Sequence, residues 1–172
     1  MRKAAINSAV VLLLAAGAAP AFAGTAADTP SREFEALKPL VGVWEGTDHA
    51  GKKVRATYRL VSGDTVLMED YTVEGENTNM VTMYHPDGNR LILTHYCMAN
   101  NQPRLVGKLT GQNPTTITFT FLDATNVKSP KDGHVHGAVF KLVDNQTLDQ
   151  EWTFRKDGKD SEKEVFNYKR VK

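Results

Sequence analysis

Short stretches of alternating apolar and polar residues recur along this sequence, with tight-turn signals between them. In residues 54–60 Val, Ala, Tyr and Leu alternate with Arg, Thr and Arg, and in residues 116–121 Ile and two Phe alternate with Thr. A period of two gives a β-strand one buried and one solvated face. Asp87-Gly88 lies between two such stretches, and glycine takes the positive φ of a tight hairpin. The pattern therefore predicts antiparallel strands joined by short turns.

This reading predicts an all-β protein of about ten strands, preceded by a short helical turn at residues 33–38 that Pro39 ends. An open sheet of this kind would expose two edges, and closure into an up-and-down barrel removes them. A two-sheet sandwich is the alternative, but its long crossing connections have no obvious place in the sequence. The expected strands lie near residues 40–48, 53–61, 65–73, 79–85, 90–98, 103–110, 115–123, 134–143, 148–156 and 164–171.

The first 23 residues have the pattern of a secretory signal peptide. Arg2 and Lys3 precede an Ala-rich apolar stretch, and Ala21-Phe22-Ala23 matches an A-x-A cleavage site. The apolar stretch ends in Ala-Pro without a stop-transfer flank, so we expect no membrane span in the mature protein. We expect cleavage near Ala23, a flexible lead-in at residues 24–33 and a single barrel domain at residues 34–172, in a periplasmic or secreted protein.

The charge balance bears on the class of partner. The chain has 21 basic and 20 acidic residues, and loss of Arg2 and Lys3 with the leader changes the net charge from +1 to −1. Without a basic excess, nucleic acid is not an expected partner. Cys97 is the one cysteine, so no internal disulfide can form and packing must hold the fold.

The stretch LVGVWEG at residues 40–46 resembles the calycin superfamily, which includes lipocalins and fatty-acid-binding proteins. Its Gly42-Val43-Trp44 matches the lipocalin G-x-W signature, and Arg170 matches the arginine on the final strand. The stretch THYCMANNQPR at residues 94–104 also resembles secreted bacterial lipocalin-like proteins of unassigned function. Ten strands fit fatty-acid-binding or nitrobindin-like barrels better than the eight of lipocalins. The resemblance implies that Arg170 covers Trp44 at the closed end of a barrel.

The order of connections in an up-and-down barrel supports this placement. The start of the first strand and the end of the tenth lie at one end, so Trp44 and Arg170 meet there. The same parity places four of the five histidines and Cys97 at the opposite end of the barrel, which is the open mouth. His85 is the exception. The residues expected at the mouth are His49, His95, Cys97, His134 and His136.

Alternation then separates the lumen from the outer surface. His95 and Cys97 share a face with Leu91 and Leu93, and we expect His134 and His136 to share the inward face of their strand. The prediction is an apolar cup with imidazoles at its rim, binding a small apolar or amphipathic ligand without enzymatic activity. The expected lumen residues are Tyr58, His95, Cys97, Phe119, His134, His136, Phe140 and Trp152.

Two other functions stay open at this point. His134 and His136 are two residues apart on one strand and, with His95, could hold zinc, or a single histidine could ligate a haem, as the nitrobindin resemblance implies. Either would give a metal- or haem-dependent enzyme. Cys97 is either a small core residue or a reactive thiol activated by His95. The third function is a structural or interaction barrel with a filled interior. No serine-hydrolase elbow, zinc-protease helix, P-loop or dinucleotide-binding motif is present in the sequence.

Overall fold

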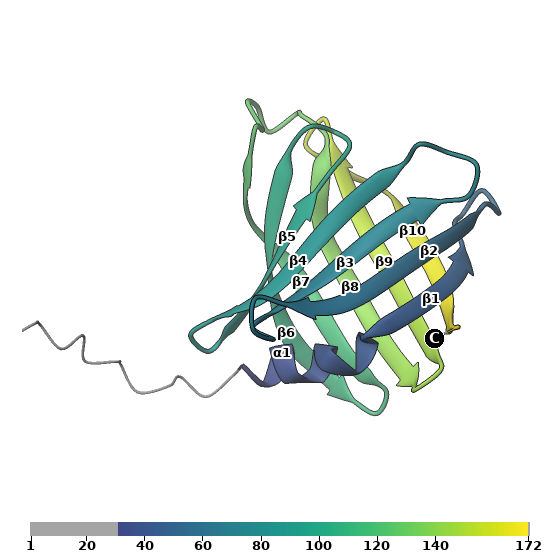
Figure 1. The fold of residues 1–172 in the computed structure, drawn as a ribbon. Coiled ribbons are helices and arrows are strands. Elements are labelled where there is room, and N and C mark those ends of the chain that lie inside the picture. Colours follow the sequence, from purple (N-terminus) through teal and green to yellow (C-terminus); the bar gives the residue numbers. More distant parts are fainter. Residues whose placement is uncertain (1–30, 172) are drawn as a thin grey trace, which may run out of the picture.

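The computed structural model describes residues 31–171, and within this range the chain forms a closed antiparallel barrel (Figure 1). Every strand pairs with its neighbour in the sequence, and β1 pairs with β10 to close the barrel. The predicted fold class, strand number and up-and-down order are therefore confirmed. The strands are β1 Gly42–Thr47, β2 Lys53–Val61, β3 Val66–Val73, β4 Asn79–Asp87, β5 Arg90–Tyr96, β6 Gln102–Gln112, β7 Thr115–Thr125, β8 His134–Asp144, β9 Thr147–Lys156 and β10 Lys159–Arg170.

The tenth strand begins five residues before its predicted start. Asp157 and Gly158 both have positive φ, 53° and 74°, so a two-residue turn is enough to reverse the chain. The charged residues that follow the turn belong to β10, and Asp160 pairs with Arg155 across the hairpin. The predicted signal peptide and most of the lead-in lie outside the described residues.

A short helix covers one end of the barrel. Helix α1 (Arg32–Leu37) continues into a 3₁₀ helix, η1 (Lys38–Leu40). The Ser31 hydroxyl caps α1 by accepting a hydrogen bond from the Phe34 N–H at 3.0 Å. Phe34, Leu37 and Leu40 are at most 2% exposed, and α1 contacts β4, β5 and β6 (Figure 1). The helix therefore closes this end with apolar side chains.

The seam that closes the barrel is short. In the register of β1 and β10, Trp44 lies opposite Arg170 and Glu45 opposite Lys169, and the Val171 N–H beyond β10 donates to the Val43 carbonyl oxygen at 2.8 Å. A Cβ added to Gly46 would lie 2.6 Å from the Asn167 carbonyl oxygen, so the close approach of the two strands requires glycine here. The seam thus depends on a few contacts, with Trp44 and Arg170 at its end.

Candidate functional site

The half of the lumen near α1 is filled by aromatic side chains. Tyr58, Tyr84, Phe119 and Phe140 are at most 1% exposed, and their ring centroids lie 5.0–6.5 Å apart. A Cβ on Gly107 would approach Leu91 and Phe119 to less than 3 Å, so the packing uses the space that glycine leaves. The predicted lumen residues Tyr58, Phe119 and Phe140 are therefore core residues of this filled half.

The half of the lumen near the mouth holds a cavity of about 200 Å³. It is lined mainly by aromatic and apolar side chains, with a few polar groups at its floor and rim. Of the predicted lumen residues, His95, Cys97 and Trp152 contribute to its wall. The complete lining is Glu69, Tyr71, Met80, Thr82, His95, Cys97, Val135, Gln150, Trp152, Phe154, Glu164, Phe166 and Tyr168.

Glu69 places a carboxyl group inside the barrel, where it is 3% exposed. It lies on β3 between Leu67 and Tyr71, which are also buried, so the alternation of the strand turns it inward. Burial raises the pKa of Glu69 to about 7, although hydrogen bonds from Tyr84, Tyr58 and Thr82 favour the charged form. Near neutral pH this carboxyl group is divided between its protonated and ionised forms.

A chain of hydrogen bonds leads from the cavity wall toward Glu69. The indole N–H of Trp152 donates to Gln150 Oε1 at 3.2 Å, and Gln150 Nε2 donates to the Tyr58 hydroxyl oxygen at 2.7 Å. Tyr58 in turn is hydrogen-bonded to Glu69. Because these buried groups satisfy one another, they hold the floor of the cavity in one arrangement.

The hydroxyl group of Tyr168 has no such partner. Tyr168 lines the cavity, its side chain is fully buried, and its hydroxyl makes no hydrogen bond within the described part of the chain. Leaving a buried polar group unpaired costs about 1–3 kcal/mol. A polar atom of a bound molecule would satisfy it, so this hydroxyl is a candidate ligand contact.

His95 forms part of the wall as a neutral side chain. It is 7% exposed, its Nδ1 lies 2.9 Å from Thr82 Oγ1, and its ring centroid lies 5.4 Å from that of Trp152. Burial lowers the pKa of His95 to about 4, so the imidazole brings no positive charge to the cavity at neutral pH.

Cys97 also lines the cavity, but its environment does not activate the thiol. Burial raises the pKa of Cys97, against a smaller lowering by the Ala99 backbone N–H. The neighbouring His95 is neutral and cannot stabilise a thiolate. The contacts of Cys97 are those of a small wall residue.

His134 and His136 lie apart from the cavity lining. The register between β8 and β9 shifts between Val135 and Gly137, and this β-bulge interrupts the alternation on which the inward assignment depended. Val135 lines the cavity instead. The two imidazoles pack on Phe121, at 5.0 and 4.6 Å between ring centroids, with His134 Nε2 3.3 Å from His136 Nδ1.

The geometry does not support the predicted metal site of His134, His136 and His95. Among residues 31–171, no three His, Cys, Asp or Glu side chains are grouped so that they could hold a metal ion. Haem does not fit the cavity either. At about 200 Å³ it is little larger than the roughly 150 Å³ that holds one benzene molecule, and a porphyrin is several times larger than benzene.

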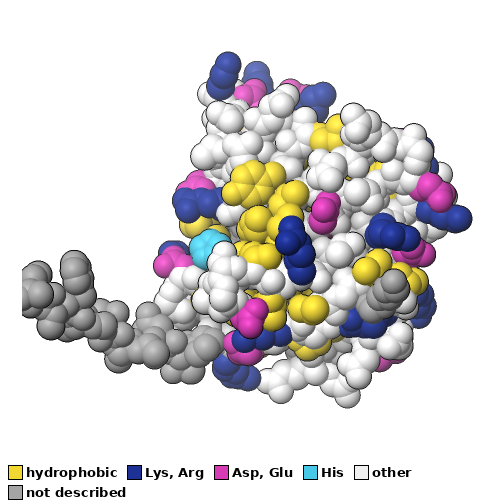
Figure 2. Space-filling view, in the orientation of Figure 1, with side chains coloured by type: hydrophobic (Ala, Val, Ile, Leu, Met, Phe, Trp, Pro, Cys, Tyr) yellow, Lys and Arg dark blue, Asp and Glu magenta, His cyan; other side chains and the backbone are white. Residues whose placement is uncertain are grey.

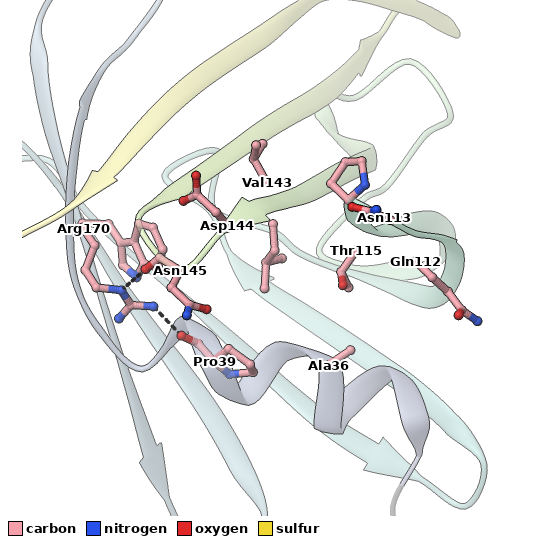
Figure 3. A pocket seen from close by; sticks show the side chains of 12 residues that line it. Ala36, Pro39, Gln112, Asn113, Thr115, Val143, Asp144, Asn145 and Arg170 are labelled. Atoms are coloured by element: carbon pink, nitrogen blue, oxygen red, sulfur yellow. Dashed lines mark hydrogen bonds between the residues drawn. The ribbon is translucent and has the colours of Figure 1, made fainter.

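A second hollow, of about 310 Å³, lies at the closed end between α1 and the turns that precede β7 and β9 (Figure 3). Arg170 borders it, with its guanidinium 4.1 Å above the Trp44 ring. The same guanidinium donates hydrogen bonds to the carbonyl oxygens of Pro39, Val41 and Asn145. The bonds to Pro39 and Val41 tie β10 to the chain entering β1, and the bond to Asn145 ties it to the turn between β8 and β9, so the charged group of this hollow already has its partners.

On the outer surface, charges of both signs surround hydrophobic side chains (Figure 2). Several lie in cross-strand pairs, including Arg104 with Asp123 and Lys163 with Glu151. Tyr96 on β5 is 49% exposed and Met98 beyond it 58% exposed. No helix within residues 31–171 has the length and apolar character needed to span a membrane.

The sequence-based prediction missed several polar and aromatic residues of the cavity lining, among them Glu69, Gln150 and Tyr168. Each of these three lies on a strand with buried residues two positions away, such as Phe166 before Tyr168 and Leu148 before Gln150. Continued alternation along β9 and β10 was therefore the available signal. For Glu69 the same signal was present, because Leu67 and Tyr71, two positions away on either side, are buried.

The fold and the geometry of the site thus define a class of protein, the ten-stranded antiparallel barrel with a small cavity near its mouth. One solved structure with this fold is a protein of unknown function from the DUF3598 family of Nostoc punctiforme, with a TM-score of 0.54 and 14% sequence identity. The match covers 87% of this chain and 53% of that one, so the chain spans about half the length of that neighbour. No family model and no curated protein matches the sequence. The likeness concerns the fold alone.

Proposed function

We propose that this protein binds a small, mostly apolar ligand in the cavity at the mouth of its barrel. The observation that carries the proposal is a cavity of about 200 Å³ with aromatic walls, whose lining includes Tyr168 with its buried, unpaired hydroxyl group. An apolar cavity of about 150 Å³ accepts benzene, so this one suits a single ring or a short branched chain with one polar group. The filled lower half of the barrel keeps the ligand near the mouth.

The calycin resemblance supports the same proposal, since it implies a barrel that opens at the end opposite Trp44 and Arg170. The cavity lies toward that opposite end, and Glu164 at its rim has a side chain that is 44% exposed. The leader-like pattern of residues 1–23 supports a periplasmic or secreted location. Cell fractionation with N-terminal sequencing of the mature chain tests this, with a new terminus near Ala23 as the expected result.

Benzyl alcohol is a suitable first probe because it joins one ring to one hydroxyl group. The intrinsic fluorescence of Trp152 reports occupancy, and a Trp44→Phe variant removes the signal of the second tryptophan. We expect a saturable change with a Kd in the micromolar to millimolar range, on the order of −4 to −8 kcal/mol.

A cavity-filling variant makes the test specific. Val135→Phe places a larger side chain in the cavity and should abolish the change, because Val135 lines it. Val139→Phe, on the same strand but in an outer-surface hollow with Lys141 and Val165, is the matched control and should bind as the original protein does. Equal binding by both variants would show that the probe lies elsewhere.

A further inference from the structure

The charges of the cavity are all of one sign. Glu69 lies at the floor and Glu164, whose carboxylate is also 3.2 Å from His49 Nδ1, lies at the rim; the lining contains no lysine or arginine. His95, the one basic residue of the wall, is neutral at physiological pH because burial lowers its pKa. The electrostatic potential inside the cavity therefore favours positive charge and opposes an anionic ligand.

The walls are formed largely by aromatic rings. Tyr71 meets Phe166 edge to face at 5.7 Å between centroids, and Phe166 stacks on Tyr168 at 5.7 Å. Trp152 and Phe154 complete the aromatic part of the lining. Aromatic faces attract cations through the ring quadrupole, more strongly where water is excluded.

The polar groups at the floor suit a hydrogen-bond donor. Glu69 accepts hydrogen bonds from Tyr84, Tyr58 and Thr82 and, as a carboxylate with about four lone-pair sites, can accept one further donor. The unpaired Tyr168 hydroxyl can accept another donor. An ammonium group carries three N–H donors and one positive charge, so it satisfies both groups and offsets the cost of a desolvated carboxylate.

We propose that the ligand of this cavity is a small organic cation, a single-ring or short-chain ammonium ion whose N–H groups bind Glu69 and Tyr168 and whose apolar part packs on the aromatic wall. This inference rests on the proposed function, because it names the chemical class of a ligand for the same cavity. The two can be separated experimentally with probes of one shape and different charge.

The probes are benzylammonium, benzyl alcohol and benzoate, measured by isothermal titration calorimetry at pH 8 on the complete protein. Benzylammonium should bind at least about tenfold more tightly than benzyl alcohol, and benzoate more weakly than either. Glu69→Gln should remove most of the preference for the cation. Asp70→Asn, the adjacent carboxylate whose partner is Asn79 Nδ2, is the matched control and should keep it.

The pH dependence in the unaltered protein gives a second test that needs no variant. Benzylammonium stays protonated between pH 5.5 and 8, whereas Glu69 ionises around pH 7. Its affinity should rise by up to about tenfold per pH unit below pH 7 and then level off, and that of benzyl alcohol should not. Tyr58, Tyr84, Tyr168 and His95, which surround Glu69, keep their neutral forms over this range.

In one outcome, benzyl alcohol binds the original protein as tightly as benzylammonium, and the affinity for benzylammonium does not depend on pH. This result would overturn the proposal that the ligand is a cation and would leave the proposed function in place. Binding of none of the three probes would overturn both. An equal cation preference in Glu69→Gln and Asp70→Asn would show that Glu69 does not receive the ammonium group, and would also overturn the inference.

Discussion

Glu69 and His95 make opposite contributions to the pH dependence of folding, and one substitution should reveal this. Burial raises the pKa of Glu69 from 4.5 to about 7, so its stabilising contribution is complete below pH 4.5 and is lost as the pH rises through 7. Burial lowers the pKa of His95 from 6.5 to about 4, so its contribution is complete above pH 6.5 and is lost as the pH falls through 4.

The expected magnitude follows from these two shifts. Each pKa unit corresponds to about 1.4 kcal/mol, so each group changes the free energy of unfolding by roughly 3 kcal/mol across its window. Both side chains are at most 7% exposed, so solvent screening reduces these values little. Between pH 4.5 and 6.5 the contributions of Glu69 and His95 to the free energy of unfolding change in opposite directions with pH, so they nearly cancel in the unaltered protein.

Glu69→Gln removes the pH-dependent contribution of Glu69 to the free energy of unfolding and leaves that of His95. The free energy of unfolding of the variant, relative to that of the original protein, should rise by roughly 3 kcal/mol between pH 4.5 and 7. His95→Gln should show the opposite trend, falling by a similar amount between pH 4 and 6.5. Urea unfolding at half-unit pH steps, followed by circular dichroism, measures both curves.

The comparison is independent of the other titrating groups, because surface carboxylates contribute equally to the original protein and to each variant. Curves for Glu69→Gln and the original protein that stay parallel within about 1 kcal/mol over this range would refute the reasoning. They would show that Glu69 titrates in the folded protein as it does in the unfolded chain.

Three further substitutions or reactions test the packing of the barrel. Arg170→Met removes the guanidinium bonds that secure the seam and should lower the free energy of unfolding by about 2 kcal/mol in urea unfolding; an unchanged midpoint would contradict that role. Gly107→Ala should cost about 1–3 kcal/mol in the same assay, because its Cβ would meet Leu91 and Phe119, and no loss would mean that the core adjusts freely. Cys97 should react with a thiol reagent at pH 7 much more slowly in the folded protein than in urea, because burial raises its pKa. Equal rates in the two conditions would mean that the thiol is exposed.

Much of the fold was accessible from local pattern. Alternation along the future β2 and β7 and the Asp87-Gly88 turn identified strands and hairpins, because side-chain direction in a strand depends only on the period of two. Parity of the connections then placed His95 and Trp44 at opposite ends. The bulge at Val135–Gly137 interrupts the alternation from which His134 and His136 were assigned to the lumen, because one extra residue reverses the facing of the residues before it.

The candidate site was less accessible, because a cavity is defined by side chains that meet across the lumen from distant strands. Glu69, Gln150 and Tyr168 lie on β3, β9 and β10, and no short sequence motif links them. Their pairing, or for Tyr168 the lack of a partner, depends on the register of each strand and on the diameter of the closed barrel.

The sequence by itself indicated about ten antiparallel strands and favoured their closure into a barrel, because alternation and turn residues act over a few positions. Only the tertiary structure decided which part of the lumen stays open. The volume of the cavity at the mouth depends on how the aromatic rings of Tyr58, Tyr84, Phe119 and Phe140 pack below it. It also depends on where a β-bulge or a glycine lets a strand shift its position. The burial that shifts the pKa of Glu69 arises only when the barrel closes around it.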